Sequence, residues 1–185
     1  MMNHIDVSSV LRQTLACDLY SNLVTRSTGA AVRTQIERLV SESRDRALTV
    51  IDFSQVSMID FSCADEIVAK LLMRYASDDA PQDAYFLFRG VSDDHWDAIE
   101  TVLERHGLAL VLEHDGRVRV VGVLSDDERH AWEAVYRIGP AGAQDVAIET
   151  GTDAVHARQA LDALCRRRLF MQADGQFVAV GDRRG

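Results

Sequence analysis

The sequence predicts an α/β fold for residues 1–124, in which helices cover a largely buried sheet, and a small domain with a different order of elements for residues 125–185. Two observations lead to this prediction. Up to about residue 124, apolar β-branched runs alternate with segments whose apolar positions recur every three or four residues, as strands and helices do. After Leu124 the order becomes helix, short helix, turn, helix and hairpin.

The first half of the α/β domain contains two predicted strands and two predicted helices. A strand is expected over residues 15–24, and a stripe of apolar residues at helical spacing predicts a helix behind Thr28 and Gly29. Residues 47–56 are a short apolar run closed by polar residues, which is typical of a buried strand. Apolar positions then return at spacings of three and four, so a helix is expected over residues 62–76.

A strand, a helix and a hairpin complete the predicted α/β domain. Residues 84–91 form the next strand, and the helix that follows has Ser92 as its N-cap and Gly107 as its C-terminal stop. The run 108–124 indicates two strands joined at the Asp-Gly pair 115–116, which is a hairpin signal.

The second domain opens on a capping box, with Ser125 as the N-cap and Glu128 three residues later. A short helix ends at Gly151, a longer helix follows, and two short strands about an Asp-Gly turn close the chain. This is the element order of a winged helix. The inward face of the longer helix is predicted to contain Ala157, Leu161, Leu164 and the stem of Arg168.

Composition excludes several classes of protein. The 185 residues are 47% hydrophobic with only two prolines, which describes an ordered globular chain. A net charge of -9 argues against a surface coated in basic residues for nucleic acid or anionic membrane. The charge is uneven, because residues 1–124 contain 12 basic and 19 acidic side chains and residues 125–185 contain 8 and 10.

The three cysteines, Cys17, Cys63 and Cys165, lack a C-x-x-C spacing, so we expect buried free thiols rather than a disulfide framework or a zinc site. No metal or cofactor is expected. The sequence contains no apolar run of membrane-spanning length and no signal peptide pattern at its start. We therefore expect a cytoplasmic protein that does not bind a membrane.

The segment 50–72, VIDFSQVSMIDFSCADEIVAKLL, resembles the core of the STAS fold. In the anti-sigma-factor antagonists of that superfamily, a partner kinase phosphorylates the last Ser or Thr before a Gly. Ser62 occupies that position here, Asp60 occupies the motif Asp, and Asp52 ends the preceding strand. Phe61 and Cys63 depart from the antagonist motif, since they replace its first small residue and its Gly. The resemblance implies a protein partner, such as a kinase-like ATPase.

Residues 15–115 are more similar to STAS-like domains of unknown function, which carry an S-R-S-x-A segment and a D-F-S…S-x-A-D-E segment. This resemblance implies the fold but no settled activity. The first segment is matched by Thr25, Arg26, Ser27 and Ala31, and the second by Asp52, Phe53, Ser54, Ser62, Ala64, Asp65 and Glu66.

Two interpretations of Ser62 stay open at this point. As a helix N-cap, Ser62 would accept a hydrogen bond from the amide of Asp65, and the carboxylates of Asp65 and Glu66 would favour the positive end of the helix. If Ser62 is instead a phosphorylation switch, its phosphate would also accept hydrogen bonds from the amides at the start of the helix. That phosphate would stand beside Asp60, Asp65 and Glu66 with no Lys or Arg nearby in the sequence, so repulsion would oppose it.

No catalytic activity is expected. Asp52 and Asp60 would be the carboxylate pair for acid/base or metal chemistry, yet no His or third carboxylate accompanies them at ligand spacing. Cys63 stands among acidic residues, which disfavour a thiolate. The sequence contains no P-loop, G-x-S-x-G or H-E-x-x-H motif.

Residues 142–170 resemble the helix-turn-helix of small bacterial winged-helix regulators. The resemblance implies binding of double-stranded DNA, in which His156, Arg158 and Gln159 would face the bases. Arg166 and Arg167 would hold phosphates, as would further arginines at 168, 183 and 184, while Asp153 and Asp162 would oppose them. A homodimer would present two such helices about 34 Å apart on a palindrome.

The sequence therefore predicts a non-enzymatic bacterial-type regulator, in which a STAS-like domain senses a protein partner and a winged helix acts in transcription. The alternative is a protein-interaction adaptor, or an antagonist-like switch phosphorylated on Ser62, that does not bind DNA.

Overall fold

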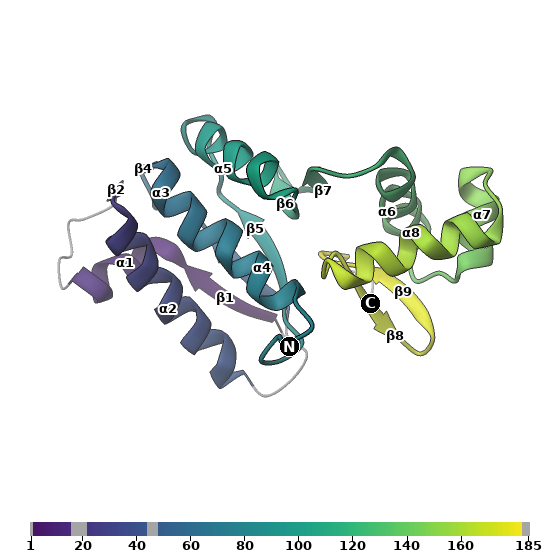
Figure 1. Ribbon diagram of the computed structural model, residues 1–185, viewed down its shortest axis with the longest axis horizontal. Helices are drawn as coiled ribbons and strands as arrows, with labels where there is room; N and C mark the ends of the chain where they lie inside the picture. Colours follow the sequence, from purple (N-terminus) through teal and green to yellow (C-terminus); the bar gives the residue numbers. More distant parts are fainter. Residues whose placement is uncertain (1, 16–21, 44–47, 183–185) are drawn as a thin grey trace.

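A computed structural model describes residues 2–15, 22–43 and 48–182 and shows a mixed α/β architecture (Figure 1). Its main sheet has five strands in the order β1-β3-β5-β6-β7, of which the first four run parallel and the last pairs antiparallel with its neighbour. The strands are β1 (Met2–Asp6), β3 (Leu48–Asp52), β5 (Tyr85–Arg89), β6 (Ala109–His114) and β7 (Arg117–Gly122). A separate parallel pair consists of β2 (Asn22–Leu23) and β4 (Met58–Ile59).

Helices cover one face of this sheet and bury its apolar side chains (Figure 1). One helical segment runs without a break through α3, η1 and α4, and its middle turn is a π-helix. The first core includes Ile51, Phe86, Phe88 and Leu110 from the strands. The helices are α1 (Val7–Leu15), α2 (Arg26–Glu42), α3 (Phe61–Ala64), η1 (Asp65–Lys70), α4 (Leu71–Ala76) and α5 (Asp93–His106).

Most of the predicted elements are confirmed, but the N-terminal region differs from the prediction. Strand β1 and helix α1 precede the expected strand over 15–24, and neither is predicted from the sequence. That expected strand is wrong at Leu15, which ends α1. Of that strand the structure contains Asn22–Leu23, while the residues between, including Cys17, lie outside the described part of the chain. Helix α2 begins already at Arg26 because Thr25 caps it.

The C-terminal half contains three helices and a hairpin, as the sequence predicts. The capping box is confirmed, since the Ser125 hydroxyl accepts from the amide of Glu128 at 3.1 Å and the Glu128 carboxylate accepts from the amide of Ser125 at 2.9 Å. Ala141 and Phe177 exchange two backbone hydrogen bonds as an isolated antiparallel bridge, which extends the pairing of the hairpin by one residue. The elements are α6 (Asp126–Ile138), α7 (Ala143–Thr150), α8 (Ala154–Arg166), β8 (Phe170–Ala173) and β9 (Gln176–Ala179). Among the described helices, none combines the length and the apolar character that crossing a membrane requires.

The second face of the main sheet packs against this C-terminal half. Alternate strand residues point away from the covering helices, and one apolar cluster joins them to Trp132 of α6 and Leu161 of α8. The two halves therefore share a hydrophobic core. The sheet residues of this core are Val50, Tyr85, Leu87, Ala109, Val111 and Val120.

Two consecutive arginines after α8 strengthen the same contact. Arg167 donates to the carbonyl of Val123 at 2.6 Å and to that of Gly107 at 3.3 Å. Arg168 donates to the carbonyl of Tyr75 at 3.0 Å and forms an ion pair with Asp83 at 2.8 Å. Both side chains thus bind the α/β half.

Replacing Gly29 by alanine should destabilise the protein, because α2 lies very close to α3 at this point. A Cβ on Gly29 would lie 2.8 Å from the Cα of Cys63, a distance that requires the backbone to move. Overpacking of this kind typically costs about 1–3 kcal/mol, and the better helix propensity of alanine returns about 1 kcal/mol. We expect a lower free energy of unfolding in urea, and an increase would contradict this account of the helix contact.

Candidate functional site

The Asp-Phe-Ser corner begins α3, and its N-cap is Asp60. One carboxylate oxygen of Asp60 accepts from the amide of Cys63 at 2.8 Å, and the other accepts from the amide of Thr25 at 3.1 Å. Burial disfavours the charged form, but these amide hydrogen bonds outweigh it and hold the pKa of Asp60 below its ordinary value. Asp60 therefore caps α3 and ties it to the start of α2.

The capping interpretation of Ser62 is wrong, because Ser62 is already the second residue of α3. The amide of Asp65, which Ser62 was expected to satisfy, donates to the backbone carbonyls of Phe61 and Ser62 instead. Asp60, two residues before Ser62, accepts from the amide of Cys63 and so acts as the cap. The Ser62 side chain is partly exposed. Its phosphorylation stays a prediction.

This geometry predicts different effects for two alanine substitutions. Asp60→Ala removes the N-cap and the link to Thr25, so we expect a loss of about 1–2 kcal/mol in the free energy of unfolding. Ser62→Ala should change it by less than about 0.5 kcal/mol, as for an ordinary partly exposed position. Urea titrations of both variants at pH 7 test this. Equal losses would mean that Ser62 contributes to the cap after all.

Asp65 and Glu66 lie in the π-helical turn and are buried, with 7% and 2% of their surfaces exposed. Such turns are frequent at functional sites. Asp65 accepts from Nη1 of Arg26 and pairs with Nε2 of His106, both at 2.7 Å. Burial opposes its charge, but Arg26 and then His106 outweigh burial and lower the pKa of Asp65.

Glu66 meets three cations. It pairs with Arg26 at 2.8 Å, with Arg33 at 3.3 Å and with Lys70 of its own helix. Burial again opposes the charge, and the contacts with Lys70 and Arg26 lower the pKa of Glu66.

The chain of ion pairs continues along the contact between α2 and the segment 61–76. Glu37 on α2 joins Arg33 at 2.7 Å to Arg74 at 3.6 Å. We call this set the seam network. Its members are Arg26, Arg33, Glu37, Asp65, Glu66, Lys70, Arg74 and His106.

The sequence has no Lys or Arg next to Ser62, but the fold brings a cation from elsewhere in the chain to Asp65 and Glu66. Arg26 comes from the first motif segment and contacts both carboxylates of the second, so the fold unites the two segments. Arg33 and His106 were missed because they come from other helices. Lys70 was detectable, since Glu66 and Lys70 have the i,i+4 spacing of a helical ion pair.

Asp52 ends β3 in a separate network. Its carboxylate accepts from Nε of Arg89 at 2.8 Å and lies 2.7 Å from Nε2 of His4, so side chains from three neighbouring parallel strands are joined. Burial opposes its charge, but hydrogen bonds from Ser54 and then from Arg89 hold the pKa of Asp52 well below its ordinary value. Asp52 and Asp60 thus have different partners and share none of them.

The face predicted to read DNA is only partly available. Gln159 and Arg166 are exposed, and Arg158 is exposed but pairs with Asp162 at 3.0 Å. The ring of His156 pairs with Asp153, the N-cap of α8. The prediction that Arg167 holds a phosphate is contradicted by its bonds to the α/β half. The arginines at 183 and 184 lie outside the described residues.

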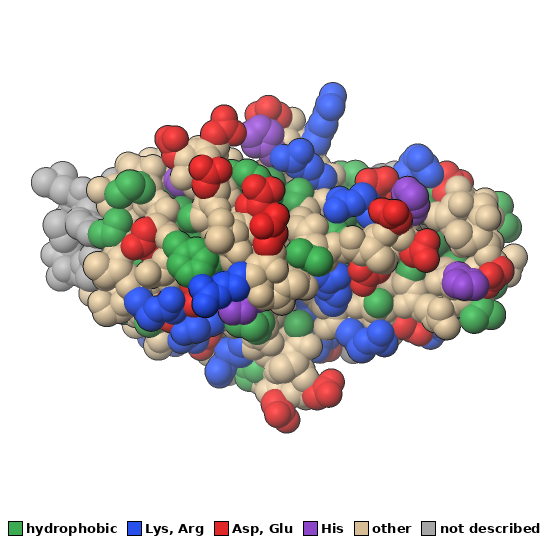
Figure 2. Space-filling view, turned by 45° about the horizontal axis from the view of Figure 1, so that its top comes forward, with side chains coloured by type: hydrophobic (Ala, Val, Ile, Leu, Met, Phe, Trp, Pro, Cys, Tyr) green, Lys and Arg blue, Asp and Glu red, His purple; other side chains and the backbone are tan. Residues whose placement is uncertain are grey.

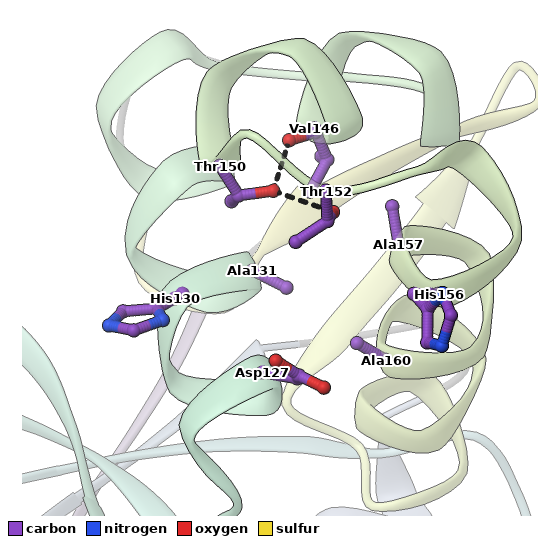
Figure 3. Close-up of a pocket in the computed structure, with 9 residues that line it drawn as sticks. All are labelled: Asp127, His130, Ala131, Val146, Thr150, Thr152, His156, Ala157 and Ala160. Carbon is purple, nitrogen blue, oxygen red and sulfur yellow. Dashed lines mark hydrogen bonds between the residues drawn. The ribbon is translucent and has the colours of Figure 1, made fainter.

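A cavity lies between α6, α7 and α8 (Figure 3). The Thr150 hydroxyl closes one end by hydrogen bonds to the carbonyl of Val146 at 2.8 Å and to the Thr152 hydroxyl at 3.0 Å. Figure 3 shows His130 and His156 on opposite sides of it. Its volume of about 20 Å³ suits a single water molecule and is too small for an organic cofactor.

No family model and no curated protein matches this sequence. The contacts themselves indicate what the residues can do. Burial, and then Asp60, raise the pKa of the Cys63 thiol to about 12, so Cys63 is a poor nucleophile. Hydrogen bonds and neighbouring cations lower the pKa values of Asp52, Asp65 and Glu66, so none of these carboxylates is tuned for proton transfer near pH 7. Within the described residues, no group of three His, Cys, Asp or Glu is placed to hold a metal ion.

Proposed function

We propose that this chain is a cytoplasmic regulatory protein without catalytic activity, which acts as an adaptor by binding other proteins. A STAS-like α/β domain and a winged-helix-like domain would be its two parts, joined through the shared core. The observation that carries the proposal is the state of the ionisable groups. The buried carboxylates of the motif segments are paired with neighbouring cations, and Arg167 and Arg168, which follow α8, bind the α/β half.

The surface around the α7–α8 turn favours a protein partner. Ile148 and Val155 are 73% and 66% exposed, one on either side of the turn in the sequence, and exposed apolar side chains of this size are typical of contact surfaces. Their exposed neighbours include the carboxylates of Asp145, Glu149 and Asp153, of which Glu149 pairs with Arg137. The excess of carboxylates would repel a phosphate backbone. An apolar centre with an acidic rim suits a partner that carries apolar and basic side chains.

DNA binding, and with it a role in transcription, is the second candidate. It is favoured by the order of α6, α7, α8 and the hairpin, and by the exposed position of Gln159 and Arg166 on α8. Specific binding would then need a homodimer, because the few remaining cations give each chain little affinity.

The two candidates are separated by a titration of the full chain with labelled duplexes of mixed sequence. The adaptor predicts no salt-dependent binding at about 50 mM salt, where electrostatic association is strongest. The DNA candidate predicts that the chain binds the duplexes and that Gln159→Ala changes its sequence preference. Arg166→Gln should lower the slope of log affinity against log salt by about 1. Either of those results would overturn the adaptor.

A capture experiment tests the adaptor directly. The full chain and its Ile148→Asp/Val155→Asp variant would serve as baits in an extract of the source organism. We expect at least one protein to be retained by the wild type and by the matched control Arg166→Gln, and to be lost by the double variant. A partner that all three baits retain equally would show that this surface is not the contact.

A further inference from the structure

The seam network has its carboxylates inside and three of its cations outside, while Arg33 is largely buried beside Glu37. The side chains of Glu66 and Asp65 are 3% and 10% exposed, whereas those of Arg26, Lys70 and Arg74 are 49%, 40% and 50% exposed. An approaching molecule therefore meets the positive groups first. Figure 2 shows Lys and Arg side chains gathered with a histidine at the lower left of this face, over the α/β half.

The charges of the seam network do not cancel. Arg26, Arg33, Lys70 and Arg74 carry four permanent positive charges against the three carboxylates of Glu37, Asp65 and Glu66. Arg105, next to His106 on α5, adds a fifth where its guanidinium lies 5.4 Å from the centre of the Phe61 ring. The seam network and Arg105 together therefore carry five permanent positive charges against three carboxylates, with the exposed Glu104 beside Arg105 at their edge, on a chain whose net charge is -9.

We infer that the seam network and Arg105 form a docking surface for an acidic segment of a partner protein. This inference deepens the proposed adaptor function, since it names the chemistry of a partner for the α/β half. From Arg26 to Glu37 the surface is about 16 Å long, at 1.5 Å per helical residue. An extended peptide covers that length with about five residues, so a short run of Asp or Glu suffices.

A peptide fits this surface better than a nucleic acid does. A long polyanion would extend beyond the seam network onto α5, whose outer side carries exposed carboxylates, and their repulsion would oppose it. The Nη1 atoms of Arg26 and Arg33 already serve internal carboxylates, so the cations present separate positive charges rather than a convergent phosphate cradle. The exposed acidic residues of α5 are Asp93, Asp94, Asp97, Glu100 and Glu104.

Lys70 makes the surface testable, because it is the only lysine in the sequence. The probe is an eight-residue peptide rich in glutamate, with a glutamine peptide of equal length as the control. We expect saturating glutamate peptide to slow acetylation of Lys70 about fivefold and to leave the N-terminal amine unaffected as an internal reference. The glutamine peptide should protect neither amine.

Charge-removing variants then locate the contact on the full chain. Arg74→Gln/Arg105→Gln changes exposed cations and leaves the contacts of Glu66 intact, and we expect it to weaken binding of the labelled peptide about fivefold. The matched control Arg117→Gln/Arg119→Gln removes two exposed charges from β7 and should change binding by less than about twofold.

Three outcomes would overturn the inference. These are absence of saturable peptide binding, equal weakening in both double variants, and stronger protection of Lys70 by a DNA duplex than by the peptide. None of them bears on the Ile148 and Val155 surface, so failure of this docking surface and failure of the adaptor function are distinguishable.

Discussion

Glu66→Gln should lower the free energy of unfolding by about 3 kcal/mol at pH 7. The substitution keeps the size of the side chain and removes only its charge, which leaves Arg26, Arg33 and Lys70 around a neutral group. Breaking a buried ion pair from one side typically costs about 3–5 kcal/mol, and the partial exposure of these cations places Glu66 at the lower end. Urea denaturation followed by circular dichroism measures the loss.

A matched control is available on α2. Glu42 pairs with Arg38 at 3.5 Å, and both side chains are more than half exposed. Surface pairs of this kind contribute about 0–1 kcal/mol, so Glu42→Gln should cost less than about 0.5 kcal/mol. Similar losses in the two variants would show that the burial of Glu66 adds nothing to its ion pairs.

The pH dependence gives a second check on Glu66. Its folded pKa is lowered from an ordinary value of 4.5, so the unfolded chain binds protons first as the pH falls. The stabilisation is complete above about pH 5 and is lost progressively below it. Since Glu66→Gln lacks this contribution, the stability gap between the variant and the wild type should narrow between pH 7 and pH 3. A constant gap would mean that the variant acts through packing instead.

Local signals predict most of the elements well. The capping box at Ser125, the Gly107 stop and the Asp-Gly pair of the hairpin each depend on contacts within a few residues. The sequence next to each boundary is therefore enough to predict where the element begins or ends. The failure at Ser62 has a similarly local cause. Ser62 and Asp60 are both good capping residues two positions apart. Asp60 also binds the amide of Thr25, 35 residues away, and no local pattern contains that contact.

The seam network required information that no local pattern contains. Arg26 and Arg33 are separated from Glu66 by 40 and 33 residues, and they meet it because α2 lies against the π-helical turn. His106 comes from the far end of another helix. The resemblance to STAS-like domains pointed to Asp65 and Glu66, but their partners depend on how three helices pack over one sheet.

The arginine run at the end of α8 shows that a local pattern can also predict an exposed basic surface that the fold largely removes. In the sequence, Arg166, Arg167 and Arg168 form a basic cluster of the kind that contacts phosphates. In the fold, only Arg166 is exposed, because the chain turns after α8 and directs the next two arginines toward the α/β half. Composition alone therefore overstated the basic surface of this half.

Leu161→Ala should destabilise both halves together, because Leu161 is fully buried in the core that they share. Truncating a buried leucine typically costs about 2–5 kcal/mol. The sheet contributes Val50, Leu87 and Val111 to the same cluster, so the α/β half should lose stability through a substitution on α8.

Trp96 on α5 reports the α/β half alone once the other tryptophan, Trp132, is replaced by phenylalanine. In that background, Leu161→Ala should lower the urea midpoint of Trp96 fluorescence and that of circular dichroism by the same amount, as expected of a single cooperative transition. The exposed control Arg166→Gln, on the same helix, should leave both midpoints unchanged. If the two halves unfold independently, the Trp96 midpoint stays fixed while circular dichroism resolves a second, earlier transition. That result would mean that the interface between the two halves contributes little stability. Binding of a partner to the α/β half would then not be coupled to α8 through the shared core.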